Sequence, residues 1–419
     1  MTAPRINHKS LVYKPNSKTK IETRIYSALL LTLAIFVLLA THLTQQPAPW
    51  GSGSPASKTS LVRAHDKQFL AGKNVYGDDE YSYASMAQSP GSGSYLNQRA
   101  PFSYRIAGPA IVWSIQFTGL SLIDRFFLLN GVGILVAVFA LYWICLDMGV
   151  DPQRAAWSSA LFLFLPPVLE ILRAPVRVDG MAWGLMFLAW WAWRRDLLFP
   201  TIFLLTAAML FRETAVLLIP CVWHDAYLRR RGNMAPAILT ISACAVLLVT
   251  HLAIGPSSSS IPIIYYIGRV LRNHWNLLRH GQALFDLTIF AGGLVICLFV
   301  VSWRVFLDRR IVPLLWLAPS ALLLVLVSFD LGRVVVSVAL LTLPAASLAI
   351  SQFRRPRVVM AATLLLSGAV GLARTTSLYE SGGHLLIAIS VVTLIAVAIL
   401  LRKRADSELS GRPVVEVGG

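Results

Sequence analysis

The sequence predicts an all-α membrane protein, a polytopic bundle of about twelve transmembrane helices with a long first extracytoplasmic loop. Apolar residues make up 56% of the 419 residues, charged residues make up 14%, and the mean hydropathy is +0.65. A soluble domain is far less apolar. Apolar runs of about 17 to 25 residues recur along the chain, and each is long enough to cross a bilayer as a helix. The runs are continuous rather than alternating, which excludes a transmembrane β-barrel.

The first apolar run covers residues 25–44 and follows a basic leader, residues 1–24. A secretory signal has a shorter charged region, a shorter apolar core and a cleavage site of small residues. We therefore expect this run to be an uncleaved anchor. The positive-inside rule places the basic leader in the cytoplasm.

The long outer loop covers residues 45–123. It begins with a Gly, Ser and Pro linker at 47–57, continues into a mixed polar and aromatic stretch, and contains a second flexible piece at 89–94. A simple connector between two spans is much shorter. The length of this loop therefore favours a functional role.

The membrane domain, residues 25–401, contains further spans joined by short loops. The spans 180–193, 197–211 and 213–227 are short, but losing one would move the basic residues at 229–231 and 354–357 to the outer side. With all spans kept and the N-terminus inside, every inner segment is basic, and the tail 402–419 is also cytoplasmic. The predicted spans are 25–44, 124–146, 155–172, 180–193, 197–211, 213–227, 235–254, 282–303, 311–328, 333–350, 357–373 and 384–401.

The formal net charge of +17 and the pI near 10.2 are compatible with nucleic-acid binding. The positive residues, however, lie in short clusters between apolar runs, where they hold loops in the cytoplasm and meet anionic lipid head groups. We therefore expect membrane lipids rather than nucleic acid as partners. The absence of a Gly-rich phosphate loop disfavours an ATP-driven pump. The four cysteines lie inside apolar runs without metal-ligand spacing, so we expect no disulfide framework: Cys145, Cys221, Cys244 and Cys297.

The densest acidic cluster lies in the first outer loop, where Asp78, Asp79 and Glu80 follow one another. Adjacent carboxylates beside an anionic membrane surface repel one another, so the triplet needs solvent, a cation, a partner or a protonated member. A carboxylate with a raised pKa can act as a general base. The alternative is a solvated turn, which is the simpler explanation of an acidic triplet taken alone.

Several arginines lie near predicted outer boundaries, where positive charge is disfavoured. Bound phosphate or paired carboxylates would explain them. Neighbouring carboxylates suggest the pairs Arg177 with Asp179, Arg212 with Glu213, Arg333 with Asp330, and Glu170 with Arg173. The outer arginines are Arg105, Arg173, Arg177, Arg212, Arg269, Arg272 and Arg333.

The outer segment 255–280 mixes aromatic and basic residues, among them Tyr265, Arg269 and Trp275. This pattern fits an interfacial helix beside the entrance of a lipid ligand, or an ordinary aromatic belt. His274 and His280 do not have the spacing of a recognised metal site. We therefore expect no metal ion and no cofactor, and a divalent cation has no support in the sequence.

Four motifs resemble the glycosyltransferase C superfamily, polytopic enzymes that take sugars from polyprenyl phosphate. Asp79-Glu80, followed after two intervening residues by Tyr83-Ala84, resembles the Asp-Glu motif of the family's first outer loop. The run Pro-Phe-Ser-Tyr-Arg-Ile-Ala-Gly-Pro at 101–109 resembles a segment that closes this loop in bacterial members. Arg212-Glu213-Thr214 is similar to a Lys-Glu-Thr segment, with arginine in place of lysine. The last motif, at 330–333, resembles an Arg-led helix start.

The resemblance covers roughly residues 25–350 and implies a bacterial inner-membrane enzyme of the mannosyltransferase or aminoarabinose-transferase type. Such an enzyme moves a sugar from a polyprenyl-phosphate carrier to an outer-face glycan, lipid or protein acceptor, with inversion. The family's catalytic base corresponds to Asp79, with Asp78 and Glu80 as neighbouring candidates. The resemblance and the charge placement together imply substrate or phosphate binding by Tyr83, Arg105, Arg212, Glu213, Arg269 and Arg333.

General chemistry supports this reading. Nucleotide sugars are confined to the cytoplasm, so sugar transfer at the outer face needs a donor carried through the bilayer. The enzyme must deprotonate an acceptor hydroxyl and stabilise the charge on the departing phosphate. The rival hypotheses are a transporter or flippase of a polyprenyl-linked glycan, in which intramembrane charges line a passage, and a noncatalytic scaffold. No hydropathy symmetry between halves supports a transporter.

Overall fold

The computed structural model describes residues 17–44, 78–88, 105–254, 293–325, 331–375 and 384–402. In that part of the chain the regular elements are α-helices and short 3-10 helices. An isolated β-bridge joins Phe353 to Arg402. The predicted all-α class is therefore confirmed.

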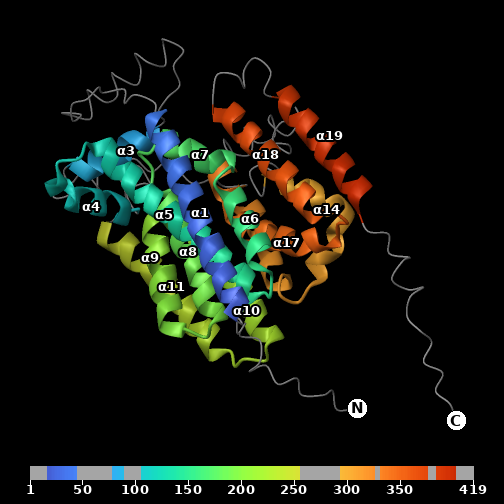
Figure 1. Cartoon of the computed structure of the whole chain (residues 1–419). Coiled ribbons are helices and arrows are strands. Elements are labelled where there is room, and N and C mark those ends of the chain that lie inside the picture. Colours follow the sequence, from blue (N-terminus) through green and yellow to red (C-terminus); the bar gives the residue numbers. More distant parts are fainter. Residues whose placement is uncertain are drawn as a thin grey trace, which may run out of the picture.

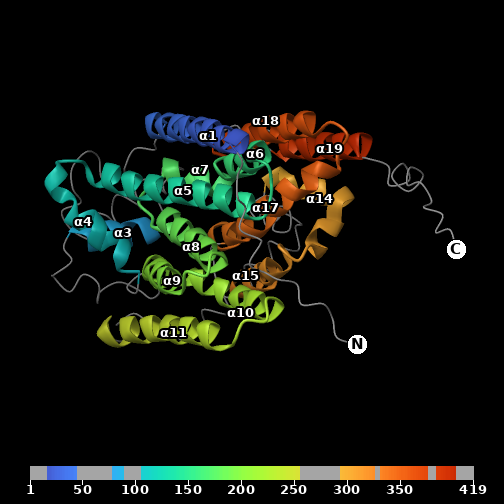
Figure 2. The ribbon, with the colours of Figure 1, turned by 60° about the horizontal axis from the view of Figure 1, so that its bottom comes forward.

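The first half of the chain packs around α5 (Leu122–Asp147), an apolar helix of 26 residues. Ser121 caps its N-terminus by accepting a 3.1 Å hydrogen bond from the backbone nitrogen of Asp124. α5 contacts α1, α4, α6, α7 and α8 of this half, while α9 and α11 extend the bundle beyond α8 (Figures 1 and 2). The elements around α5 are α1 (Ser17–Leu43), α3 (Asp78–Gln88), α4 (Ala107–Ser114), η3 (Gln116–Thr118), α6 (Pro152–Phe162), α7 (Pro166–Arg173), α8 (Asp179–Arg194), α9 (Leu198–Phe211), η4 (Glu213–Leu217), α10 (Leu218–Leu228) and α11 (Met234–Ile254).

The second half consists of shorter helices interrupted by 3-10 turns. α17 contains Pro344, which cannot donate a backbone hydrogen bond inside the helix. α17 also packs on α5 and α6 and so joins the two halves. The elements are η5 (Gly293–Val295), α14 (Ile296–Ser302), η6 (Trp303–Leu307), η7 (Val312–Trp316), α15 (Leu317–Val325), α16 (Leu331–Val335), η8 (Val336–Val338), α17 (Ala339–Ala349), η9 (Ile350–Gln352), α18 (Pro356–Thr375) and α19 (His384–Leu401).

Every predicted span overlaps helical segments of the structure. Among the described residues, four helices are long and apolar enough to cross a membrane singly, or five segments if one bent pair is counted as a span. That pair is α6 and α7, which replace the predicted continuous span 155–172 and meet at 55°. Pro166 and Pro167 open α7, and neither supplies the backbone N–H that a continuous helix needs. The number of about twelve spans stays a prediction.

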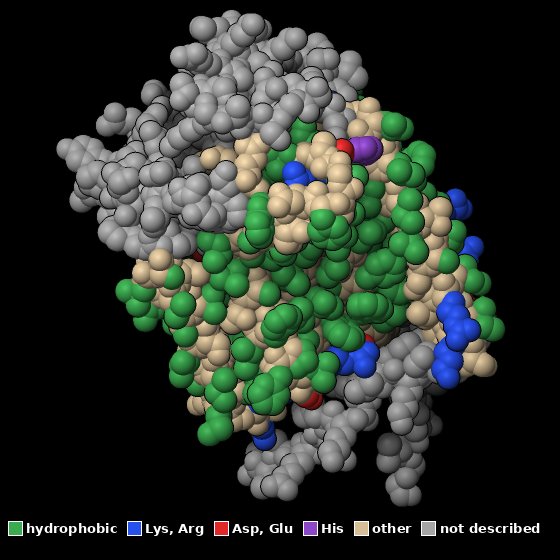
Figure 3. Space-filling model, turned by 90° about the vertical axis from the view of Figure 1, so that its left-hand side faces the viewer, with side chains coloured by type: hydrophobic (Ala, Val, Ile, Leu, Met, Phe, Trp, Pro, Cys, Tyr) green, Lys and Arg blue, Asp and Glu red, His purple; other side chains and the backbone are tan. Residues whose placement is uncertain are grey.

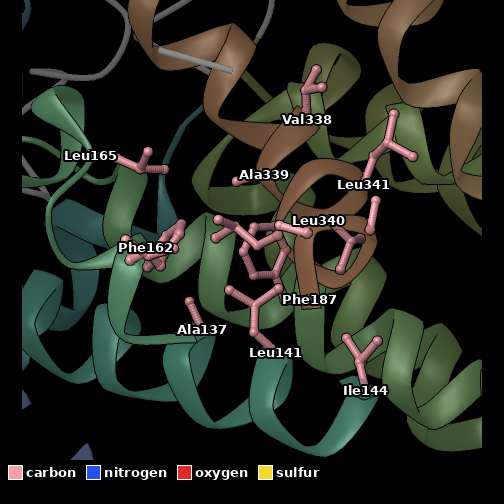
Figure 4. Close-up of a cluster of buried hydrophobic side chains, with 14 of the residues drawn as sticks. Ala137, Leu141, Ile144, Phe162, Leu165, Phe187, Val338, Ala339, Leu340 and Leu341 are labelled. Carbon is pink, nitrogen blue, oxygen red and sulfur yellow. The ribbon is translucent and has the colours of Figure 1, made fainter. Parts of the chain in front are cut away.

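α5 and α8 lie unusually close because glycines face each other. A Cβ atom added to Gly184 would overlap the carbonyl oxygen of Gly133, and one added to Gly133 would overlap the backbone of Met181. Small residues allow helix backbones to approach where no hydrophobic effect drives packing. Beyond this contact, Leu141, Phe187 and Leu340 meet in an apolar core that joins α5, α8 and α17 (Figure 4).

The outer helices present apolar surface. In the most apolar stretch of α1, and likewise of α11, only 22% of the residues are buried. Phe36 in α1 is 68% exposed and Leu252 in α11 is 73% exposed. Hydrophobic side chains also cover the middle of the face in Figure 3, with Lys and Arg side chains toward its lower and right-hand edges. Such surface belongs in lipid. The protein is an integral membrane protein.

Polar contacts gather separately at the two ends of α5. At the C-terminal end, Arg195 donates two hydrogen bonds of 2.6 and 2.7 Å to Asp147, and Arg310 contacts the carbonyl oxygen of Met148. These residues come from predicted inner segments. At the N-terminal end, Arg125 donates a 2.9 Å hydrogen bond to the carbonyl oxygen of Val112, in a predicted outer segment. These contacts lie at opposite ends of α5, while the side of the membrane that each end faces, and the cytoplasmic location of the termini, stay predictions.

Candidate functional site

The centre of the site is Asp179, the first residue of α8. A carboxylate is favourable there because the positive end of the helix dipole lies at the N-terminus. Its side chain is fully buried and contacts two guanidinium groups from other elements. Arg212 contacts Asp179 Oδ1 from the end of α9, and Arg333 Nη1 donates a 3.3 Å hydrogen bond to Oδ2 from α16.

A second ion pair joins Arg105, just before α4, to Glu213, the first residue of η4. Arg105 donates hydrogen bonds of 2.9 and 2.5 Å to the two carboxylate oxygens of Glu213. It also donates a 2.9 Å hydrogen bond to the hydroxyl of Tyr83 in α3. Burial alone would lower the pKa of Arg105, but Glu213 and Tyr83 outweigh burial and raise that pKa well above its usual value. Arg105 therefore stays charged and ties α3 to the bundle.

The two groups form one charged cluster, because Glu213 follows Arg212 directly and Arg105 and Arg333 both lie near enough to repel Arg212. The cluster contains three arginines, which are 2% to 8% exposed, and the carboxylates of Asp179 and Glu213. Arg212 Nε is buried and makes no hydrogen bond within the described part of the chain. A buried donor without an acceptor is costly. The cluster has one more positive group than negative groups, and an acceptor at Arg212 Nε would remove this cost.

Asn130 in α5 holds the segment that leads into Asp179. Its side chain is fully buried and donates hydrogen bonds of 2.8 and 2.9 Å to the carbonyl oxygens of Pro175 and Arg177. Its oxygen accepts a 3.0 Å hydrogen bond from the backbone nitrogen of Gly180. The four apolar residues that line this segment, Ala174, Val176, Val178 and Ala182, pack in a core with Tyr83.

The structure brings together four of the predicted phosphate-binding and substrate-binding residues besides Arg105. These are Tyr83, Arg212, Glu213 and Arg333, which come from α3, the end of α9, η4 and α16. Sequence reasoning missed Asp179 as a member of the site, although a carboxylate directly before a predicted apolar span was a usable signal.

Three predicted ion pairs were wrong. Arg212 contacts Asp179 rather than Glu213. Arg177 and Glu170 pair with each other at 2.8 Å, instead of with Asp179 and Arg173, and Arg173 donates to the carbonyl oxygen of Thr44. The predictions used nearness in sequence, whereas residues beside a helix start point in different directions.

The acidic triplet opens α3, which begins at Asp78. The side chains of Asp78, Asp79 and Glu80 lie outside the described part of the structure, and so do Arg269 and the segment 255–280. Asp330, the predicted partner of Arg333, is also outside it. No three His, Cys, Asp or Glu side chains gather to hold a metal ion among the residues that the structure describes.

Comparisons with known proteins identify a fold. No protein-family model and no curated protein matches the sequence. The chain is similar in structure to ArnT from Cupriavidus metallidurans, solved in a crystal structure bound to undecaprenyl phosphate. The TM-score is 0.50 with 15% sequence identity, over 90% of this chain and 72% of that chain. The shared fold agrees with the one that the motif resemblance implies.

Proposed function

We propose that this protein is an integral-membrane glycosyltransferase that moves a sugar from a polyprenyl-phosphate carrier to an acceptor at the outer face of a bacterial inner membrane. The observation that carries the proposal is the burial of Arg105, Arg212 and Arg333 in one cluster at the predicted outer end of the bundle. A similar fold binds undecaprenyl phosphate in the ArnT structure. The sugar is a hexose or a pentose, and the acceptor is a glycan, a lipid or a protein.

Phosphate recognition follows from the chemistry of the arginines. Guanidinium groups match phosphate oxygens in geometry and stay charged when buried. Arg212 has a buried N–H without a partner among the described residues. Arg212 and Arg333 would hold the phosphate of the carrier, while Arg105 keeps α3 beside them through Tyr83. Arg269 remains part of this proposal from the sequence.

The reaction would be a single displacement with inversion. An acceptor hydroxyl attacks the anomeric carbon, the bond from that carbon to the phosphate oxygen breaks, and the phosphate leaves as polyprenyl phosphate. The hydroxyl proton passes to a carboxylate, for which we assign Asp79, with Asp78 and Glu80 as alternatives. Asp79 lies one helical turn before Tyr83 in α3, and Tyr83 binds Arg105. The arginines stabilise the charge that develops on the leaving phosphate.

The test uses membranes that contain the full-length wild type or Asp79→Asn, supplied with radiolabelled undecaprenyl-phosphate hexoses and pentoses. Movement of label out of the carrier-lipid fraction measures transfer, and binding of undecaprenyl phosphate is measured on the same purified proteins. We expect the wild type to bind and transfer, and Asp79→Asn to bind without transfer. A wild type that neither binds nor transfers overturns the function, whereas full activity in Asp79→Asn overturns only the assigned base. A flippase would instead move carrier lipid across sealed vesicles without transferring sugar.

A further inference from the structure

We infer that Asp179 is a resting counterion for the phosphate-binding arginines, and that a phosphate ligand binds in competition with it. This inference rests on the proposed function, because its ligand is the phosphate of a polyprenyl carrier. It adds a role for a carboxylate that the proposed displacement does not use. The role is to lower the affinity of the site for phosphate.

The geometry of the site supports the first half of the inference. Asp179 is fully buried, and its two oxygens each face a guanidinium group, one from Arg212 and one from Arg333. These groups come from elements far apart in sequence, the end of α9 and α16. Two buried guanidinium groups without an anion would repel each other and lose their hydration. Asp179 therefore stabilises the site while no ligand is bound.

Competition follows from the donors that a phosphate would use. A phosphate seeks the same guanidinium N–H groups that now face Asp179, with Arg212 Nε as an additional unpartnered donor. Once phosphate is bound, two anions share the same arginines in a site of low dielectric, and their repulsion opposes binding. The carboxylate must move, or share its donors, before the phosphate is fully held.

This competition would act most strongly on the product. The donor is a phosphodiester with one negative charge, whereas the released polyprenyl phosphate is a monoester that carries up to two. A fixed carboxylate therefore repels the product more than the donor. Asp179 would speed product release, a step that often limits turnover.

The alternative is a purely structural Asp179 that holds Arg212 and Arg333 in place for the ligand. Asp179→Asn keeps the size of the side chain and removes its charge. The two roles predict changes of opposite sign in the phosphate affinity of this variant. Loss of a competing counterion strengthens phosphate binding, whereas loss of a positioning anchor weakens it. The sign of the change in affinity therefore decides between them.

The experiment measures binding of undecaprenyl phosphate to the full-length protein in lipid nanodiscs, with undecaprenol as the uncharged probe. We expect Asp179→Asn to bind undecaprenyl phosphate at least about fivefold more tightly than the wild type does, which is the lower range of couplings between two sites. We expect both proteins to bind undecaprenol with the same affinity. The matched control is Asp225→Asn. Asp225 is 1% exposed and accepts hydrogen bonds from Trp193 and Arg194, but it belongs to the opposite end of the bundle. We expect this variant to bind undecaprenyl phosphate as the wild type does.

If folded Asp179→Asn binds undecaprenyl phosphate as tightly as the wild type or more weakly, the inference is overturned. The proposed function still stands in that case, provided that the wild type binds undecaprenyl phosphate. If Asp179→Asn does not fold, Arg333→Gln is compared with the double variant Asp179→Asn/Arg333→Gln. Both variants lack the positive charge of Arg333, and only the double variant also lacks the negative charge of Asp179. Tighter binding by the double variant supports the inference, and equal or weaker binding overturns it. A wild type that does not prefer undecaprenyl phosphate over undecaprenol overturns the proposed function together with the inference.

Discussion

The backbone nitrogen of Gly180 donates a 3.0 Å hydrogen bond to the side-chain oxygen of Asn130, which lies 50 residues earlier in the chain. This bond joins the start of α8 to the N-terminal half of α5, at a point where Asn130 and Gly180 are both buried. Asp179 precedes Gly180 directly. The position of the central carboxylate of the site is therefore set by α5, a helix that contributes no charge to it.

Asn130→Leu should destabilise the protein, because it leaves the carbonyl oxygens of Pro175 and Arg177 and the nitrogen of Gly180 without partners. Each unpaired buried group costs about 1 to 3 kcal/mol. We expect the melting temperature to fall on the order of 5 to 10 °C in thermal unfolding of the purified protein. The control is Thr363→Val, which removes one hydrogen bond inside α18 and should have a much smaller effect. Equal shifts in the two variants would contradict the role of Asn130.

Gly184→Ala should prevent the close approach of α5 and α8, because the added Cβ would overlap the carbonyl oxygen of Gly133. A clash with backbone cannot be relieved by a rotamer change. We expect little folded protein, measured as the monodisperse fraction after detergent extraction. Gly232→Ala is the matched control, since no atom lies within 4 Å of a Cβ at that position. A yield of folded Gly184→Ala equal to that of the wild type would show that α5 and α8 can move apart without loss of folded protein.

Arg105→Lys should lower sugar transfer by about 10-fold to 100-fold, although the charge is kept. Lysine cannot form the paired hydrogen bonds that Arg105 donates to Glu213 while also reaching Tyr83. The loosened contact would let α3, which carries Asp79, move away from the arginines. The measurement is the transfer rate at saturating donor.

Tyr83→Phe separates the contact of Arg105 with Tyr83 from its contact with Glu213. It removes only the hydroxyl that accepts from Arg105 Nη1 and leaves the bond to Glu213 intact. A single hydrogen bond to a charged group contributes about 1.5 to 3 kcal/mol. We expect a smaller loss of transfer than in Arg105→Lys. A larger loss would assign Tyr83 a direct role in the reaction.

The predicted topology can be tested by thiol labelling in a Cys244→Ala background, because Cys244 is the exposed cysteine among the described residues. Ser82→Cys in α3 should react with a membrane-impermeant reagent added to intact cells. Arg309→Cys, at an exposed position in a predicted inner segment, should react only after the membrane is opened. The reverse pattern would place α3 in the cytoplasm and remove the basis for sugar transfer at the outer face.

The fold class and most helix positions followed from hydropathy alone. Apolar runs long enough to cross a bilayer have one main solution, because backbone polar groups in lipid must be satisfied inside the segment. Among the described residues, helices overlap each predicted span, and the break before Pro166 lies at the proline pair that the sequence displays. Arg105, Arg212 and Arg333 were recognisable because positive charge is unusual at outer boundaries.

The partners of those arginines were not recognisable. Arg212 and Glu213 are adjacent in sequence, yet one contacts Asp179 in α8 and the other contacts Arg105 before α4. Adjacent side chains at the start of η4 point to different sides, and only the packing of several helices decides which charges meet.

The sequence by itself determined a helical membrane protein with unusual outer charges, because burial of apolar runs in lipid depends on composition and length. Tertiary structure alone decided that Asp179 stands between Arg212 and Arg333, and that Asn130 and the glycines of α5 and α8 hold it there. Ion pairing requires distances of a few ångströms between residues that are far apart in the chain. Such distances arise only when the helices pack.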